Sequence, residues 1–187
     1  MAGAIVTDSV AVLGIAVINV PDGSIVVANL LADGNVSRVE LDRVRTVGAV
    51  PSDSGYASQW SLPKIGWDQV YGTVVPSGSA VVALLDTGVE ASHPDLAGQL
   101  VAGTSILDGS AGITDPNGHG TAMAGIIAAL TDNGQGIAGV GYAGVKVMPI
   151  TVLNSAGLGQ DSDIILGVVY AVDHGANVIT MSFSNPG

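Results

Sequence analysis

The second half of the chain alternates short apolar runs with segments whose apolar residues recur at helical spacing. Runs of Val, Ile and Leu bounded by turn residues predict buried strands, whereas apolar residues three or four positions apart predict helices. We therefore expect a strand at 80–85, a helix at 120–130, a strand at 145–153, a helix at 162–174 and a strand at 177–182. This alternation is typical of an α/β fold, in which a parallel sheet carries helices on both faces.

The beginning of the chain has a different pattern. Residues 10–20 are rich in Val and Ile and predict a strand, residues 25–31 predict a short helix, and residues 36–41 alternate as in a second strand. Turn-forming residues follow, which predicts an exposed junction at 45–51.

This junction divides the chain into an amino-terminal part, residues 1–47, and an α/β domain, residues 48–187. In parallel sheets, ligands and catalytic groups gather beyond the carboxyl ends of the strands. The residues that directly follow the predicted strands are therefore the first candidates for a functional site.

Charge and composition narrow the classes of partner. The chain has 16 Asp and Glu residues against 5 Lys and Arg, a net charge of −11. Nucleic acids and anionic membranes are bound through Lys and Arg, so we expect neither as a partner. The acidic surface favours solubility, and some aspartates could bind hard cations. The chain has no cysteine, which excludes disulfides and thiolate metal sites.

No targeting or membrane segment is recognisable in the sequence. The most apolar stretch, residues 10–20, is too short to span a bilayer and contains Asn19. Residues 1–8 lack the basic start and the apolar run of a signal peptide.

Two side chains stand out as candidates for chemistry. Asp86 follows the strand predicted at 80–85 and precedes a Thr-Gly turn, which places its carboxylate at the carboxyl end of a strand. His119 lies between two glycines, which allow another segment to approach its ring closely. The positive end of the helix predicted to follow disfavours the imidazolium and keeps the ring able to act as a base. Taken singly, Asp86 could cap a turn and His119 could be a surface residue.

Three segments together resemble the subtilisin family of serine peptidases, the subtilases. Residues 86–89 (Asp-Thr-Gly-Val) with 92–96 (Ser-His-Pro-Asp-Leu) are similar to its aspartate motif. Residues 117–125 (Asn-Gly-His-Gly-Thr-Ala-Met-Ala-Gly) are similar to its histidine motif, and residues 177–187 to the strand beside its substrate pocket. The resemblance is collinear from about residue 51 to the end of the sequence.

The resemblance implies catalysis by an Asp-His-Ser triad. Asp86 would orient His119 and stabilise its imidazolium, and His119 would take the serine proton and return it to the leaving amine. The family's oxyanion-hole Asn and Gly-Thr-Ser-Met-Ala serine motif are not found in these 187 residues. We therefore expect a serine endopeptidase whose nucleophile lies beyond this chain, and we expect the chain alone to be inactive. Ala122 stands where the family often has a second histidine, outside the triad.

The resemblance also implies contacts with protein or peptide substrates. Residues 156–159 and 182–184 resemble the two segments that pair with an extended substrate and line its first pocket. Glycines suit this role, because a peptide strand must approach the backbone to form sheet hydrogen bonds. An ordinary surface turn is the alternative for the first segment. The implied substrate-binding residues are Gly157, Leu158, Gly159, Ser182, Phe183 and Ser184.

Residues 131–138 are similar to the calcium loop of the family. The resemblance implies a structural Ca²⁺ held by two carboxylates, one side-chain amide oxygen and three backbone carbonyls, which meets the demand of calcium for six to eight oxygens. A plain glycine turn is the alternative. The implied ligands are Asp53 and Asp95, then Asn133, then Leu130, Gln135 and Ile137.

The amino-terminal part, residues 1–47, resembles the last part of the inhibitor-type propeptide that accompanies these enzymes. That propeptide is a small ferredoxin-like α+β domain, and its first half has no counterpart here. Cleavage would fall near residues 47–51, and a small accessory domain of other purpose is the alternative. The family resemblance, rather than a signal peptide, implies a secreted, extracellular protein.

Two other functions stay open. Residues 83–88 (Ala-Leu-Leu-Asp-Thr-Gly) also resemble the retroviral aspartic peptidase motif, in which two carboxylates share a proton across a dimer, but this interpretation leaves the histidine segment unexplained. The missing serine motif instead favours a truncated, non-catalytic pseudo-peptidase or a binding module. If the protein is a peptidase, the missing carboxyl-terminal part of the catalytic domain is a further expected partner.

Overall fold

The computed structural model describes residues 5–20, 23–42, 50–74 and 78–184. Contacts between residues divide the chain into two units, Met1–Val47 and Gly48–Gly187. Most of the junction expected at 45–51, including most of the expected cleavage region, lies outside the described residues.

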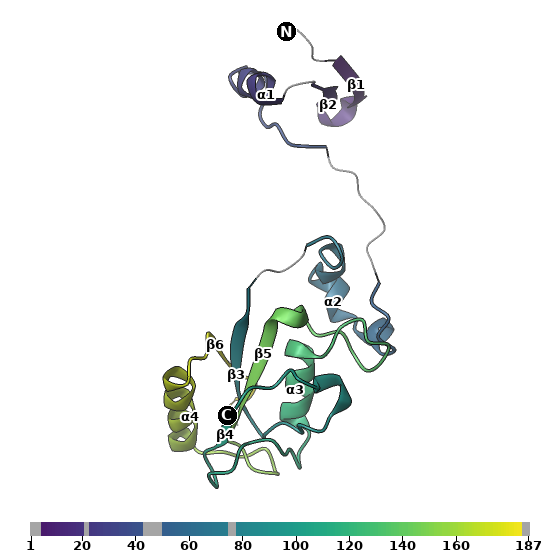
Figure 1. The fold of residues 1–187 in the computed structure, drawn as a ribbon. Helices are drawn as coiled ribbons and strands as arrows, with labels where there is room; N and C mark the ends of the chain where they lie inside the picture. Colours follow the sequence, from purple (N-terminus) through teal and green to yellow (C-terminus); the bar gives the residue numbers. More distant parts are fainter. Residues whose placement is uncertain (1–4, 21–22, 43–49, 75–77, 185–187) are drawn as a thin grey trace. The chain divides into compact units, whose positions relative to one another are not determined.

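The first unit contains an antiparallel hairpin followed by a helix (Figure 1). The hairpin pairs β1 (Ile5–Val10) with β2 (Ile15–Asn19), and the helix is α1 (Gly23–Leu31). Between the strands, η1 (Ala11–Leu13) ends at Gly14, whose φ of 64° reverses the chain.

The strand expected at 10–20 is therefore wrong, because the apolar run folds back on itself at Gly14. Residues 36–41 form no strand either. The helix expected at 25–31 is confirmed, and it begins two residues earlier, at Gly23. No residue of either hairpin strand is fully buried. Whether this unit is a propeptide remnant stays a prediction.

The second unit is built on a four-stranded sheet in the order β4-β5-β3-β6, with every pair parallel. Its strands are β3 (Ala80–Asp86), β4 (Thr104–Ser105), β5 (Val145–Thr151) and β6 (Val178–Met181). The strands expected at 80–85, 145–153 and 177–182 are thus confirmed, whereas β4 was not predicted.

The pairing register places the carboxyl ends of β3, β5 and β6 side by side at one end of this sheet. Asp86 lies opposite Thr151 on β5, and Leu85 lies opposite Met181 on β6. The polar residues that end or follow these strands therefore share one edge of the sheet.

Two helices cover opposite faces of the sheet (Figure 1). They are α3 (His119–Ala128) and α4 (Asp161–Asp173), close to the helices expected at 120–130 and 162–174. Successive strand residues point to opposite faces, so Leu84 packs on the α3 side with Ala124, whereas Leu85 packs on the α4 side with Ala171. Burial on both faces explains why β3 is a continuous apolar run rather than an alternating one.

The segment before β3 is fixed by aromatic contacts. It contains η2 (Tyr56–Ser58), α2 (Ser61–Lys64) and η3 (Trp67–Gln69). The Trp67 ring is buried and stacks on Tyr71 and Tyr142, with centroids 4.8 Å and 5.2 Å away. Tyr142 belongs to η5 (Tyr142–Gly144), which leads directly into β5.

Among the described residues, no helix has both the length and the apolar character needed to cross a membrane.

Candidate active site

Asp86 is the last residue of β3, and its side chain is only 1% exposed. The neighbouring backbone N–H of Thr87 donates to its Oδ1 at 2.7 Å. A buried carboxylate is costly unless hydrogen bonds compensate for the lost water. The ring of His119 supplies the other contact.

His119 is the first residue of α3 and follows a glycine with φ of 92° at the N-cap. Only glycine adopts this conformation easily, and it turns the chain sharply into the helix. The next residue, Gly120, presses against the loop after β3: a Cβ there would lie 2.1 Å from the carbonyl oxygen of Gly88. The start of α3 and the end of β3 are thus in direct backbone contact.

The sharp turn at Gly118 and the contact of Gly120 with Gly88 bring the Asp86 carboxylate and the His119 ring together. The ring Nδ1 lies 2.8 Å from Oδ1 and 3.0 Å from Oδ2 of Asp86. With Nδ1 carrying the proton, the ring donates to the carboxylate, and the other nitrogen, Nε2, is left with a free lone pair. The His119 side chain is 42% exposed, and among the described residues none bonds to Nε2. The pair therefore presents a buried carboxylate, an oriented imidazole and an accessible ring nitrogen.

A third group, Asp115, was not predicted from the sequence. Its Oδ1 accepts from Thr87 Oγ1 at 2.8 Å and from Gly118 N at 2.9 Å, and its Oδ2 accepts from Thr121 N at 2.8 Å. Partial burial disfavours its charged form, but hydrogen bonds led by that of Thr121 outweigh burial and hold the pKa of Asp115 below its usual 3.8. A carboxylate four residues before a histidine that starts a helix was the available signal.

The first predicted substrate segment lies next to the histidine segment. Asn117, two residues before His119, donates from Nδ2 to the carbonyl oxygen of Ser155 at 3.0 Å. The following turn is tight, with Gly157 at φ of 75°, and Leu158 is 66% exposed. Gly159 packs closely on the strand end, because a Cβ there would lie 2.4 Å from the carbonyl oxygen of Val152.

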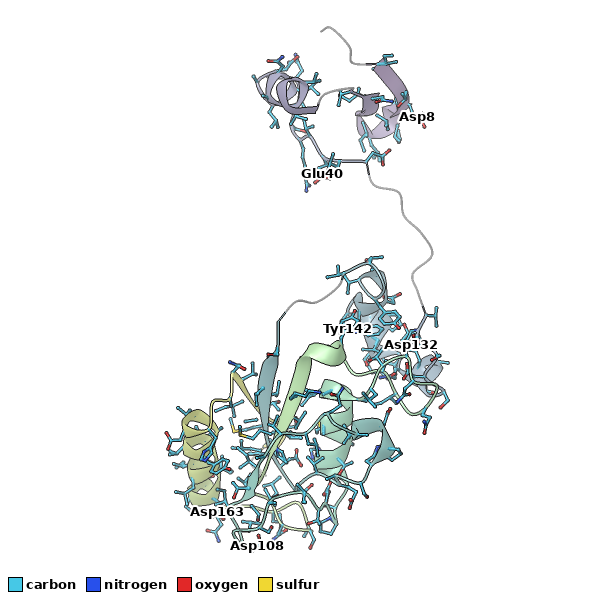
Figure 2. The ribbon with its side chains drawn as sticks, viewed as in Figure 1. Asp8, Glu40, Asp108, Asp132, Tyr142 and Asp163 are labelled. Atoms are coloured by element: carbon cyan, nitrogen blue, oxygen red, sulfur yellow. The ribbon has the colours of Figure 1, made fainter. Side chains whose placement is uncertain are left out.

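The second predicted substrate segment follows β6 at the same edge of the sheet as Asp86. Ser182 and Ser184 are exposed, whereas Phe183 is partly buried and packs against the core on the α4 side. Phe183 thus anchors the segment. Figure 2 shows Asp108 and Asp163 near this end of the sheet, with Asp132 and Tyr142 toward the other end.

Of the predicted calcium ligands, the two carboxylates both touch the loop after α3. Asp53 accepts from the N–H of Asp132 at 2.7 Å through Oδ2, and its buried Oδ1 has no partner among the described residues. Asp95 accepts from Asn133 Nδ2 at 2.8 Å and from the N–H of Ile137 at 2.9 Å. The backbone N–H of Leu130 donates to the carbonyl oxygen of Asp95, and the N–H of Gln135 to Asn133 Oδ1.

Within the described residues, no three His, Cys, Asp or Glu side chains form a metal-binding group. A cation at this loop would therefore depend on backbone carbonyls, and Asn133 would have to present its oxygen instead of its nitrogen.

A cavity of about 360 Å³ borders α3 and is lined in part by His93, Thr121 and Ala122. Ala122 is the position where the sequence departs from the histidine motif. Neither Asp86 nor His119 lines this cavity.

Comparison with known proteins agrees with this fold. The sequence model of the Subtilase family matches residues 77–187. Thermitase from Thermoactinomyces vulgaris is 40% identical over 133 residues, which cover 71% of this chain and 47% of thermitase. Subtilisin DY from Bacillus licheniformis is 41% identical over 127 residues, covering 68% of this chain and 45% of that protein.

A solved structure of a protease from Pseudoalteromonas arctica PAMC 21717 superposes with a TM-score of 0.59 at 30% identity, covering 72% of this chain and 51% of that one. The chain belongs to the subtilase family. It spans about half the length of the curated relatives it matches. Those relatives include proteins named intracellular and one named extracellular.

Proposed function

We propose that the protein is a serine endopeptidase of the subtilisin type, in which Asp86 and His119 are two members of the catalytic triad. The observation that carries the proposal is the contact of the His119 Nδ1 with both oxygens of the buried Asp86 carboxylate. This contact fixes the tautomer, so that Nε2 can remove a proton from a nucleophile on the exposed side.

In this mechanism the carboxylate remains ionised and stabilises the imidazolium that forms when Nε2 takes the proton. The imidazolium then protonates the leaving amine, and a water molecule repeats the cycle to release the acyl group. The serine and the oxyanion-hole Asn lie outside these 187 residues, so the chain alone is expected to be inactive.

The exposed face of α4 supports a partner for this unit. Ile165 is 62% exposed and Val169 is 51% exposed, and β6 is the edge strand beside this helix. We propose that the remainder of the catalytic domain covers this face and pairs with β6. Thermitase and subtilisin DY are matched over only 47% and 45% of their own length, which agrees with this proposal.

The decisive experiment uses the full-length protein that carries this chain. Incubation with a fluorophosphonate probe should label one serine and abolish hydrolysis of a protein substrate, whereas pepstatin should have no effect. His119→Ala should lose both labelling and hydrolysis. Sensitivity to pepstatin would indicate an aspartic peptidase, and a folded protein that neither reacts nor hydrolyses would indicate a pseudo-peptidase.

Substrate would bind along the segments 156–159 and 182–184. Ser155, which directly precedes the first segment, accepts a hydrogen bond from Asn117 beside the histidine, and the second segment follows β6 at the end of the sheet that carries Asp86. An extended peptide could add backbone hydrogen bonds to Gly157 and Gly159 on one side and to Ser182 and Ser184 on the other. Leu158 and Phe183 would then line the first pocket.

Calcium is proposed as a structural ion at the loop 131–137. The unpartnered buried oxygen of Asp53, the carboxylate of Asp95 and the amide of Asn133 are hard oxygen donors of the kind calcium prefers. Carbonyls of Leu130, Gln135 and Ile137 would complete the set. When bound, the ion would neutralise the two carboxylates and hold the 131–137 loop against the 51–55 segment.

The calcium proposal is tested by thermal unfolding in calcium, in magnesium and after chelation. Free calcium at about 100 times its dissociation constant should stabilise the protein by about 2.7 kcal/mol. Asp53→Asn should remove this response, whereas Asp108→Asn, on a separate exposed loop, should retain it. Equal stability with and without calcium would contradict the site.

Secretion and the propeptide role of residues 1–47 stay predictions. Relatives named intracellular and extracellular both match, so the family does not decide the compartment. Secretion is checked by whether the native host releases the protein. The propeptide role is checked by whether the purified enzyme begins near residues 47–51.

A further inference from the structure

We propose that Asp115 is a positioning residue that holds His119 in register with Asp86. This inference rests on the proposed function, because it concerns the same pair of residues. Asp115 touches neither ring nor carboxylate of that pair. It acts through the residues that directly follow each of them.

Several hydrogen-bond donors meet at the Asp115 carboxylate. Oδ1 accepts from Thr87 Oγ1, from Asn117 N at 3.2 Å and from Gly118 N. Oδ2 accepts from Thr121 N and from Thr121 Oγ1 at 2.6 Å. Five donors thus surround one side chain, and charge-assisted hydrogen bonds of this kind are among the stronger ones in proteins.

Some of these donors are backbone N–H groups at the start of α3. The first N–H groups of a helix have no partners within the helix. The N-cap residue here is Gly118, which has no side chain to satisfy them. Asp115 takes the N–H of Thr121, and through Thr87, whose Oγ1 accepts from Gly120 N at 3.0 Å, it also orders the N–H beside His119. Asp115 therefore replaces the missing cap.

The hydroxyl of Thr87 links the two elements of the site. Thr87 is adjacent to Asp86 and donates its hydroxyl to Asp115 while accepting from Gly120, which is adjacent to His119. A single hydroxyl and a single carboxylate thus join the end of β3 to the start of α3. Without the carboxylate, the Thr87 hydroxyl loses the acceptor that fixes its orientation. The distances between His119 Nδ1 and Asp86 would then no longer be held at 2.8 Å and 3.0 Å.

The test follows the Nδ1–H proton of His119 by NMR in the full chain, because a hydrogen bond to a buried carboxylate moves this resonance strongly downfield. His119→Asn assigns the signal. Asp115→Asn presents an amide that can accept on only one atom and should abolish the resonance. Thr87→Val removes the hydroxyl at almost constant shape and should do the same, whereas Thr87→Ser should retain it.

Asp108→Asn is the matched control. Asp108 also accepts a backbone N–H two residues further on, that of Ser110 at 2.9 Å, but it is exposed and, among the described residues, makes no hydrogen bond to Asp86, Thr87 or His119. The resonance should be unchanged in this variant. Near-ultraviolet dichroism establishes that each variant is folded, and if Asp115→Asn does not fold, the Thr87 pair of variants decides.

In the full-length enzyme, Asp115→Asn should lower kcat about 100-fold with KM nearly unchanged, because the loss is one of alignment rather than of substrate binding. Retention of the downfield resonance in folded Asp115→Asn or Thr87→Val, or its loss in Asp108→Asn, would overturn the inference. Its absence from the unsubstituted chain would contradict the pair itself and therefore both proposals. A protein with the expected resonances that fails to react with a fluorophosphonate would contradict only the proposed function.

Discussion

The helices α3 and α4 lie on opposite faces of one sheet, yet they are covered to very different degrees. In α3, Ala124 and Ala128 are fully buried, and Ile126, at 47%, is the one exposed large apolar residue among its described positions. In α4, Gly167 and Ala171 are buried. Four large apolar residues of α4 are each more than half exposed: Ile165, Leu166, Val169 and Val172.

The apolar side chains of α3 are therefore mostly covered, whereas those on the outer face of α4 are exposed. On the α3 side, small residues allow the helix to approach the sheet closely, and this closeness brings His119 to Asp86. A helix with apolar residues on all sides is typical of a buried helix, so α4 has the pattern of an element covered on its second face as well. The proposed catalytic pair and the surface proposed to bind the rest of the domain therefore lie on opposite faces of the sheet.

The largest expected difference between the two sides concerns activity. His119 begins α3, whereas His174 directly follows α4 and is exposed. In the full-length enzyme, His119→Ala should lower kcat by about 10⁶-fold, the cost of removing the corresponding residue in subtilisin. His174→Ala should leave kcat unchanged. Steady-state hydrolysis of a peptide substrate measures kcat for both variants. An equal loss of kcat in His119→Ala and His174→Ala would contradict the placement of the catalytic site at the start of α3.

Next in size is the loss of a buried leucine. Leu84 is 1% exposed and packs against α3, so Leu84→Ala should destabilise the second unit by about 2–5 kcal/mol. Leu166→Ala should change the stability of the chain by less than about 0.5 kcal/mol, because Leu166 is 55% exposed. Urea unfolding checks both values.

The same Leu166→Ala substitution in the full-length protein tests whether the outer face of α4 is covered there. If the second face of α4 is covered there, the cost should rise to about 1.5–3 kcal/mol. A cost below about 0.5 kcal/mol in both contexts would show that nothing packs on this face.

Two buried helical glycines provide a smaller contrast. A Cβ on Gly167 of α4 would lie 2.8 Å from Val152 Cγ1 and 3.1 Å from Leu85 Cδ2, so Gly167→Ala should destabilise by about 1–3 kcal/mol. A Cβ on Gly125 of α3 would meet only Ile137 Cδ1, at 3.4 Å. Gly125→Ala should therefore stabilise by about 0.5–1 kcal/mol through helix propensity. Thermal unfolding that shifted both variants in the same direction would contradict this packing.

The smallest expected effect is the pH dependence at the start of α3. The pKa of Asp115 lies below its ordinary 3.8, so its contribution to stability is present above that value and is lost as the pH falls through the lower folded pKa. Asp115→Asn should therefore be less stable than the unsubstituted chain at neutral pH, and the gap should shrink below pH 3.8. Urea midpoints at several pH values measure the gap, and a constant gap would contradict the assignment.

The sequence predicted best those elements that depend on local pattern. The runs that became β3, β5 and β6 are apolar because both faces of the sheet are covered, and their ends were found to within two residues. The hairpin hidden in residues 10–20 was missed, because a run apolar throughout does not reveal where it folds back. β4 was missed because it has two residues and is defined only by its pairing with β5.

The site divides in the same way. Asp86 and His119 could be predicted as a pair because their motifs are continuous in the sequence, and the structure places the ring Nδ1 of His119 2.8 Å from Asp86 Oδ1. The role of Asp115 depends on Thr87, 28 positions away, and the stack of Trp67 on Tyr142 joins residues 75 positions apart. Such contacts depend on the folded topology, which spacing along the chain does not specify.

The contact between Gly88 and Gly120 has a consequence for how this sequence can diverge. A side chain on Gly120 would strike the carbonyl of Gly88, and one on Gly88 would strike the carbonyl of Thr114, both at 2.1 Å. The clashing atoms belong to the backbone, so a substitution of a neighbouring side chain cannot relieve the clash. A saturation library at either position should return only glycine among the functional clones. During evolution, the aspartate and histidine segments must therefore change together in a way that preserves this close backbone contact.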